Sequence, residues 1–166
     1  MLPLAVMIAG CESRVAKGHF FRLDWGGGLA YFPWESYWDT EGSNYRKVIL
    51  ISNKEQVDGL FSETYSQNYS EKAQSWGKDN KFTDLVNGYG DSFFENSQIV
   101  TFIATAGGGN GRFEHSATTF ENEVLTIELY YKADGQGIAA LVRWLCIIEI
   151  AKVPLDTQIE IRVAKD

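Results

Sequence analysis

Two histidines and two cysteines are the side chains of this sequence best suited to nucleophilic or metal chemistry. They are His19, His115, Cys11 and Cys146. A zinc site needs three or four closely spaced His, Cys or carboxylate ligands, and the sequence shows no such spacing. Cys146 with His115 would make a nucleophile and its base, but Cys146 lies within the apolar run LVRWLCIIEI. That run predicts a buried, unreactive thiol, so we expect no catalytic residue, no metal and no cofactor.

The glycine-rich stretch GGGNG at 107–111 is the next candidate, and it does not match a phosphate-binding loop. No Lys-Ser or Lys-Thr follows it, and a G-x-G-x-x-G pattern is absent. It predicts a hairpin turn or, alternatively, a loop tip that enters a partner's groove, formed by Gly108, Gly109 and Asn110. Asp24 and Glu35 would suit a glycosidase, but 22 acidic residues make such pairs easy to find.

Two aromatic groups are candidates for binding. The first, with tryptophan prominent, comprises Trp25, Phe32, Trp34, Tyr37 and Trp38. It either closes one end of a β core or forms a surface that stacks on sugars or protein. The second lies in the polar stretch 62–81, which combines Ser, Gln and Asn with Tyr65, Tyr69 and Trp76. This composition is typical of adaptable binding loops, although a merely solvated loop has the same character.

The charge balance argues against nucleic acid as a partner. The formal net charge is −7 over 166 residues, and Arg46-Lys47 is the longest basic run. Affinity for DNA and RNA comes largely from clusters of Lys and Arg. The acidic surface instead favours solubility and repulsion from anionic membranes.

The first residues of the chain resemble the end of a bacterial lipoprotein signal. Residues 2–10 carry no charge and lead into Ile8-Ala9-Gly10-Cys11, which is similar to a lipobox. The stretch is too short for a membrane-spanning helix, which takes about 20 residues, and a basic front is missing. The resemblance implies that Cys11 is diacylated and holds the protein on a membrane. An ordinary apolar first strand or a frayed N-terminus is the alternative.

Hydrophobic patterning predicts a β-rich domain with few helices. Ser52 as N-cap with Glu55 matches a capping box and predicts a helix over 53–63. A second short helix around Phe82 should stop at Gly88 or Gly90. Strands are predicted over 19–25, 29–32, 45–52, 97–106, 112–121, 124–132, 140–153 and 157–163.

Three expectations concern individual strands. The stretch 140–153 should form a central strand because Ile, Val and Trp dominate it, and Glu149 within it is expected on a solvated sheet face. The stretch 157–163 alternates strictly, so it should be a half-buried or edge strand. In 112–121 the alternation places Phe113, His115, Ala117 and Thr119 on one face.

These elements predict a mainly β (α+β) fold, an antiparallel β-sandwich or half-barrel with one or two short helices. Residues 1–18 are interpreted as the signal remnant, lipobox and tether. Residues 19–166 are interpreted as a single β-rich domain, since their length is that of one ordinary domain.

The order of these pieces resembles the protease complex subunit PrcB family of small bacterial envelope lipoproteins. The pieces that carry the resemblance are VILISNKEQVDGLF, DSFFENSQIVTFIA, the glycine turn and the final IEIRV strand. The family's turn typically has Gly-Gly-Tyr where this chain has Gly108-Gly109-Asn110. The resemblance implies a non-enzymatic domain that associates with, stabilises or restrains a partner, often a protease.

Together these observations predict a non-enzymatic, envelope-anchored protein-binding module. It would be lipid-anchored to the outer face of the cytoplasmic membrane or lie in the periplasm, and its partner would be an envelope or secreted protein such as a protease. The alternative is a carbohydrate or cell-wall binding module that uses exposed tryptophans, with polysaccharide as the ligand.

Overall fold

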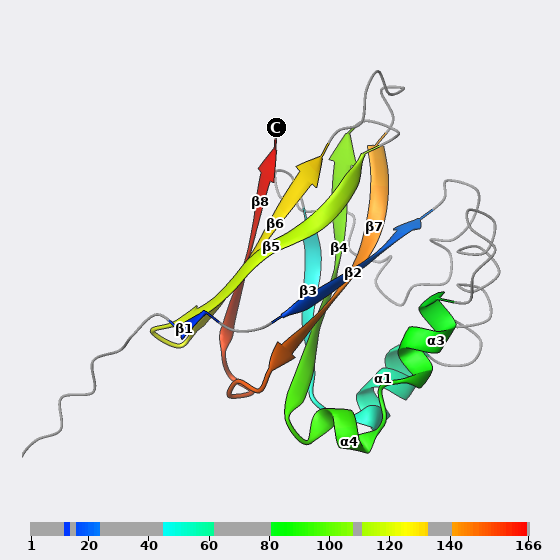
Figure 1. The fold of residues 1–166 in the computed structure, drawn as a ribbon, viewed down its shortest axis with the longest axis vertical. Helices are drawn as coiled ribbons and strands as arrows, with labels where there is room; N and C mark the ends of the chain where they lie inside the picture. Colours follow the sequence, from blue (N-terminus) through cyan, green and yellow to red (C-terminus); the bar gives the residue numbers. More distant parts are fainter. Residues whose placement is uncertain are drawn as a thin grey trace, which may run out of the picture.

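The computed structural model describes residues 12–13, 16–23, 45–61, 81–107, 111–132 and 141–165. They form eleven described elements, shown in Figure 1. In chain order these are β1 (Glu12–Ser13), β2 (Lys17–Leu23), β3 (Tyr45–Ile51), α1 (Lys54–Leu60), α3 (Lys81–Asn87), α4 (Asp91–Phe94), β4 (Ser97–Gly107), β5 (Arg112–Glu121), β6 (Val124–Lys132), β7 (Leu141–Ala151) and β8 (Gln158–Lys165). The predicted strand over 29–32 lies outside the described residues.

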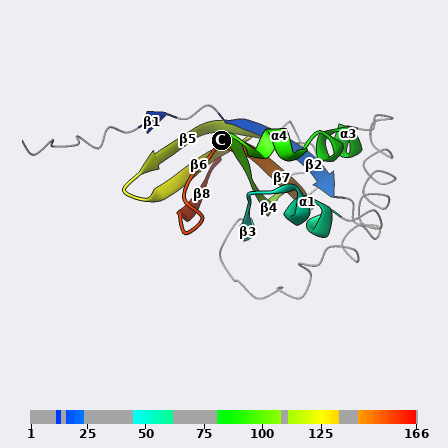
Figure 2. The same ribbon diagram turned by 90° about the horizontal axis from the view of Figure 1, so that it is seen from below.

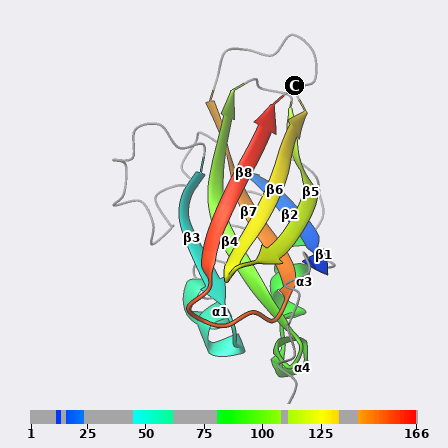
Figure 3. The ribbon, with the colours of Figure 1, turned by 90° about the vertical axis from the view of Figure 1, so that its left-hand side faces the viewer.

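The described strands form two four-stranded sheets, which confirms the predicted sandwich architecture. The outer sheet has the order β1-β5-β6-β8, and the central sheet has the order β2-β7-β4-β3. All pairs are antiparallel except β6 with β8. That exception arises because the chain leaves the outer sheet after β6, runs back through β7 in the central sheet, and returns in the direction of β6 (Figure 3).

The N-terminal strands bring the two sheets together along one side. β1 pairs with β5 in the outer sheet, and β2, which begins a few residues later, pairs with β7 in the central sheet. At Gly18 a Cβ atom would lie 2.9 Å from the Cβ of His115 on β5. Only glycine permits so close an approach. The arrangement is therefore a sandwich with one side partly closed, close to the predicted half-barrel.

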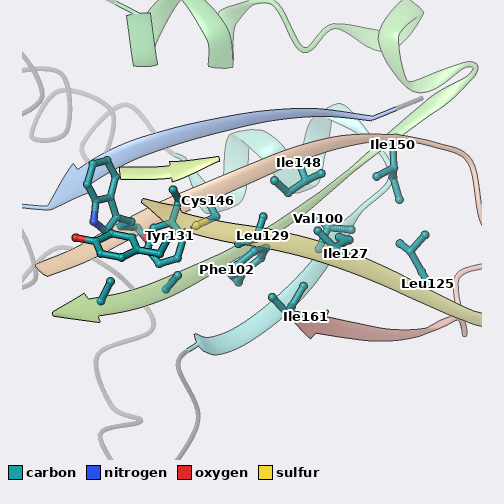
Figure 4. Packing of buried hydrophobic residues seen from close by; sticks show 14 of the residues in the cluster. Val100, Phe102, Leu125, Ile127, Leu129, Tyr131, Cys146, Ile148, Ile150 and Ile161 are labelled. Carbon is teal, nitrogen blue, oxygen red and sulfur yellow. Dashed lines mark hydrogen bonds between the residues drawn. The ribbon is translucent and has the colours of Figure 1, made fainter. Parts of the chain in front are cut away.

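The central sheet is buried on both faces. Alternate residues of β4 and β7 enter an inter-sheet core, which Figure 4 shows, and a helix-side core. The inter-sheet core consists of Val100, Phe102, Ala104, Ala106, Phe113, Leu125, Ile127, Leu129, Tyr131, Trp144, Cys146, Ile148, Ile150, Val153 and Ile161. The helix-side core consists of Ile51, Val57, Phe61, Phe82, Val86, Tyr89, Phe94, Ile99, Ile103, Leu145 and Ile147. Burial on both faces explains the nearly continuous apolar sequence of β7, whose predicted central position is confirmed.

The helices cover the face of the central sheet that points away from the outer sheet (Figure 2). The first helix is where the sequence predicts it, but Asn53, not Ser52, is its N-cap. Asn53 Oδ1 accepts from the Gln56 amide at 2.9 Å, and Gln56 Oε1 accepts from the Ser52 amide at 2.7 Å. Asparagine caps as well as serine, so the N-cap bond is kept one residue further on. The returning side chain differs from a capping box, because Gln56 reaches the amide of Ser52, the residue before the N-cap, and not that of Asn53.

The second helix is confirmed, and a third was not predicted. α3 ends at Asn87, directly before Gly88, as the glycine signal indicates. The four residues of α4, Asp91–Phe94, lie between the predicted second helix and the predicted strand over 97–106. A helix of four residues is about one turn long, so no helical hydrophobic period can be recognised in its sequence.

The predicted face of β5 is wrong beyond His115. The register between β5 and β6 shifts between His115 and Ala117. This irregularity moves Thr118 to the interior, where it is 2% exposed, and leaves Ala117 and Thr119 only half-buried. An inserted residue reverses the inside-outside alternation of everything that follows it, and strict period-two counting cannot detect it.

The β5–β6 hairpin generates a stability prediction. Its two turn residues, Asn122 and Glu123, have φ of 50° and 65°, as a two-residue type I′ turn requires. The Cβ of Glu123 is unfavourable there. We expect Glu123→Gly to raise the free energy of unfolding by about 0.5–1 kcal/mol, measured by urea unfolding. Glu121→Gly removes the same charge from the last residue of β5, so it should lower that free energy by a similar amount. A loss of stability in Glu123→Gly would contradict the turn geometry.

Candidate functional site

All the residues predicted from the sequence to bind a partner lie outside the described residues. So does the predicted acylation site, Cys11. Their positions in the chain relative to the described strands are nevertheless fixed. Cys11 directly precedes β1, and the β2–β3 connection contains Trp34 and Trp38. The β4–β5 connection contains Gly108, Gly109 and Asn110. The connection between α1 and α3 contains Tyr69 and Trp76.

Three connections leave the sandwich at the same end. Leu23, the last residue of β2, pairs with Arg143 near the start of β7, and Gly107, the last residue of β4, pairs with Leu141. Arg112 and Lys132 pair where β5 begins and β6 ends. We call this the loop end; in Figure 1 β4, β6 and β7 have these ends at the top, and β2 ends at the right. The β2–β3, β4–β5 and β6–β7 connections all attach here. The described strand ends that flank the tryptophan-rich segment, residues 25–38, and the glycine turn therefore lie at one end of the fold. The segment with Tyr69 and Trp76 instead joins two helices.

The N-terminal strand attaches at the opposite end, which we call the anchor end. Glu12 of β1 pairs with Phe120, next to the β5–β6 hairpin. The β7–β8 connection lies there too, since the amide of Gln158 donates to the carbonyl of Glu123 at 3.2 Å. Because Cys11 is covalently joined to Glu12, an acyl group on Cys11 would attach at this end.

The thiol and imidazole considered as a catalytic pair have separate structural roles. Cys146 is 0% exposed within the inter-sheet core, as predicted, and its Sγ lies 3.8 Å from the carbonyl oxygen of Trp144. Burial raises the pKa of this thiol. His115 Nε2 is 2.8 Å from Thr118 Oγ1, and burial lowers the pKa of its imidazole. Burial thus disfavours both the thiolate and the imidazolium that such a pair would need.

Glu149 is not on a solvated face. Its side chain is 23% exposed, and its Oε1 lies 2.8 Å from Nε2 of His19 and accepts from the Tyr89 hydroxyl at 3.1 Å. It lies on the helix-covered face of β7, on the same side as Leu145 and Ile147. Burial of Tyr89, together with the charge and hydrogen bond of Glu149, raises the pKa of that tyrosine. The hydroxyl therefore stays protonated and donates to the carboxylate.

Next to this network lies an open pocket of about 400 Å³ between β2 and α3. The described residues that line it are His19, Phe20, Phe21, Asp84 and Leu85. The sequence analysis missed it because its two walls are more than 60 residues apart in the chain and no motif joins them. The signal that could have found part of it is the period-two spacing of His19 and Phe21, which places both on one face of β2.

Among the described residues, no group of three or more His, Cys, Asp or Glu could hold a metal ion. None of the described helices combines the length and apolarity needed to cross a membrane. No protein-family model, no curated protein sequence and no solved structure matches the chain. The function proposed below therefore depends on the chain's own residues and geometry and on the short motifs that resemble a known family.

The burial of Cys146 predicts an unreactive thiol. In a Cys11→Ser variant, which leaves Cys146 as the one cysteine, we expect Ellman's reagent to react at least about a hundredfold more slowly with native protein than in denaturant. Absorbance at 412 nm follows the reaction. A native rate near that of a free thiol would show that the sheets open readily at β7. It would also make Cys146 and His115 a candidate catalytic pair again.

Proposed function

We propose that this chain is a non-enzymatic binding domain that engages another protein through its loop end and is held in the cell envelope through Cys11. The observation that carries the proposal is the opposed placement of the strand ends. The strands flanking the tryptophan-rich segment and the glycine turn meet at the loop end, and β1 pairs at the anchor end.

The chemistry of the attached segments suits protein recognition. Trp and Tyr are enriched in protein interfaces because they combine large apolar area with a hydrogen-bonding group. Connections on a rigid scaffold are the usual carriers of binding function, and here the scaffold has two packed cores. The thiol, imidazole and carboxylate described above, by contrast, take part in packing and structural hydrogen bonds.

The resemblance to the PrcB family supports a protease as the partner class. In that interpretation the domain would associate with the protease or restrain it, and the glycine turn would enter the partner's groove. Because this chain has Asn110 where that family typically has tyrosine, its contacts at the turn would differ from those of the family. A cell-wall polysaccharide stacked on Trp34 and Trp38 is the alternative ligand.

Site-specific crosslinking tests the loop end. A photo-reactive amino acid at Gly109 or Trp34, in the full chain expressed in its source cells, should give a discrete adduct with one protein. The matched control is Leu155, which is 73% exposed in the β7–β8 connection at the anchor end, and its adduct should be at least about fivefold weaker. Equal adducts from both ends, or none from the loop end, would refute the proposed interface. A muramidase-sensitive smear would favour polysaccharide.

The proposed anchor has its own test. The intact mass of the protein purified from the membrane fraction should show loss of residues 1–10 and gain of acyl chains on Cys11, since two chains hold a protein stably on a bilayer. Cys11→Ser should move the protein to the soluble fraction without changing its fold. An unmodified chain that begins at Met1 would exclude the lipoprotein interpretation and leave the loop-end proposal standing by itself.

A further inference from the structure

The pocket between β2 and α3 has an apolar wall built from partly exposed side chains. Phe21 and Leu85 pack against the helix-side core without being fully covered. Phe21 is fixed by edge-to-face contact with Phe82, at a centroid distance of 5.2 Å. The Phe20 ring stacks on Phe113 and packs against the inter-sheet core. This wall suits an aliphatic chain.

The described polar side chains that line the pocket are the Asp84 carboxylate and the His19 imidazole. Asp84 is exposed on α3, and no ion pair of its carboxylate occurs among the described side chains. His19 is 18% exposed, and its Nε2 is occupied by Glu149. In the neutral imidazole a proton on Nε2, donated to that carboxylate, leaves Nδ1 as an acceptor. A ligand group that matches the Asp84 carboxylate, and Nδ1 of His19 in this tautomer, must bring donors.

The local charge also favours a cation. Asp84 lines the pocket and Glu149 lies directly behind His19, within a chain of net charge −7. Lys17 is opposite Glu149 in the β2–β7 register and offsets part of this charge. Tyr89 adds none, because its raised pKa keeps its hydroxyl neutral. An anionic group would be repelled by Asp84, whereas a guanidinium would gain a charge-assisted bond to it.

We propose that this pocket receives a basic side chain, arginine above all, presented by the protein partner. The apolar stem would lie along Phe21 and Leu85, and the guanidinium would reach Asp84 and His19. The volume of about 400 Å³ suffices for one such side chain. Because the pocket is open and not an enclosed cavity, it suits a side chain delivered by a larger surface better than a free small molecule. The identity of the occupant rests on the proposed protein-binding function.

The probe is acetyl-arginine-methylamide, titrated into the ¹⁵N-labelled full chain carrying Cys11→Ser. We expect saturable amide shifts at Phe21 and Leu85 with a Kd of about 1–10 mM, as suits a single side chain. Acetyl-citrulline-methylamide has the same shape without the charge and should bind at least about fivefold more weakly. This comparison separates recognition of the cation from simple apolar contact.

Matched variants then test whether Asp84 supplies the charge that recognises arginine. Asp84→Asn should weaken arginine binding about fivefold and leave citrulline binding unchanged. Asp156→Asn removes an equal exposed charge from the β7–β8 connection, and it should change neither the arginine affinity nor the citrulline affinity. Equal binding of arginine and citrulline, an unchanged Kd in Asp84→Asn, or no saturable shift at Phe21 and Leu85 up to about 50 mM would each overturn the proposal. The titration contains no partner protein, so its outcome is independent of the loop-end crosslinking. Failure of the titration alone would overturn the arginine pocket, and failure of the crosslinking alone would overturn the loop-end interface.

Discussion

Burial of the central sheet on both faces is the constraint on which the rest of this structure depends. Successive residues of β7 enter opposite cores, with Cys146 and Ile148 between the sheets and Leu145 and Ile147 beneath the helices. A strand in this position has no solvated face for polar groups, so each one there needs a partner. Thr101 accordingly donates to the carbonyl of Cys146 at 3.0 Å.

Glu149 shows how the fold accommodates a charge under this constraint. It lies near the end of β7 on the helix-covered face, where two elements approach it from different sides. β2 contributes His19, and the α3–α4 junction contributes Tyr89, both to the same carboxylate oxygen. A half-buried carboxylate is tolerated when its hydrogen bonds are satisfied. The network thereby ties β2 and the helices to β7, and it also fixes the imidazole that lines the adjacent pocket.

The elements that were predictable from the sequence are those whose signal is local and periodic. The apolar run of β7, the alternation of β8 and the capping residues before α1 each gave the correct element. Features set by partners far along the chain were not predictable. The irregularity after His115 depends on pairing with β6, the parallel direction of β8 depends on β7 joining the other sheet, and the partners of Glu149 are 60 and 130 residues away. In the candidate site, only the strand register shows that the flanking strands of the tryptophan-rich segment and the glycine turn end together.

The separation of the two ends gives the proposed anchor a mechanical consequence. β4 has 11 residues, so at about 3.3 Å per residue it spans roughly 35 Å. With Cys11 acylated next to Glu12 at the anchor end, strands upright on the membrane would hold the loop end about that far from the lipid surface. β4 is the second strand from one edge of a sheet with cores on both faces, so an anchored domain would act as a rigid spacer and not as a flexible tether. A partner engaged at the loop end would then have to present its surface well away from the membrane. This geometry favours a partner that is soluble in the compartment, or one with a tall extramembrane domain, over a protein lying flat on the bilayer.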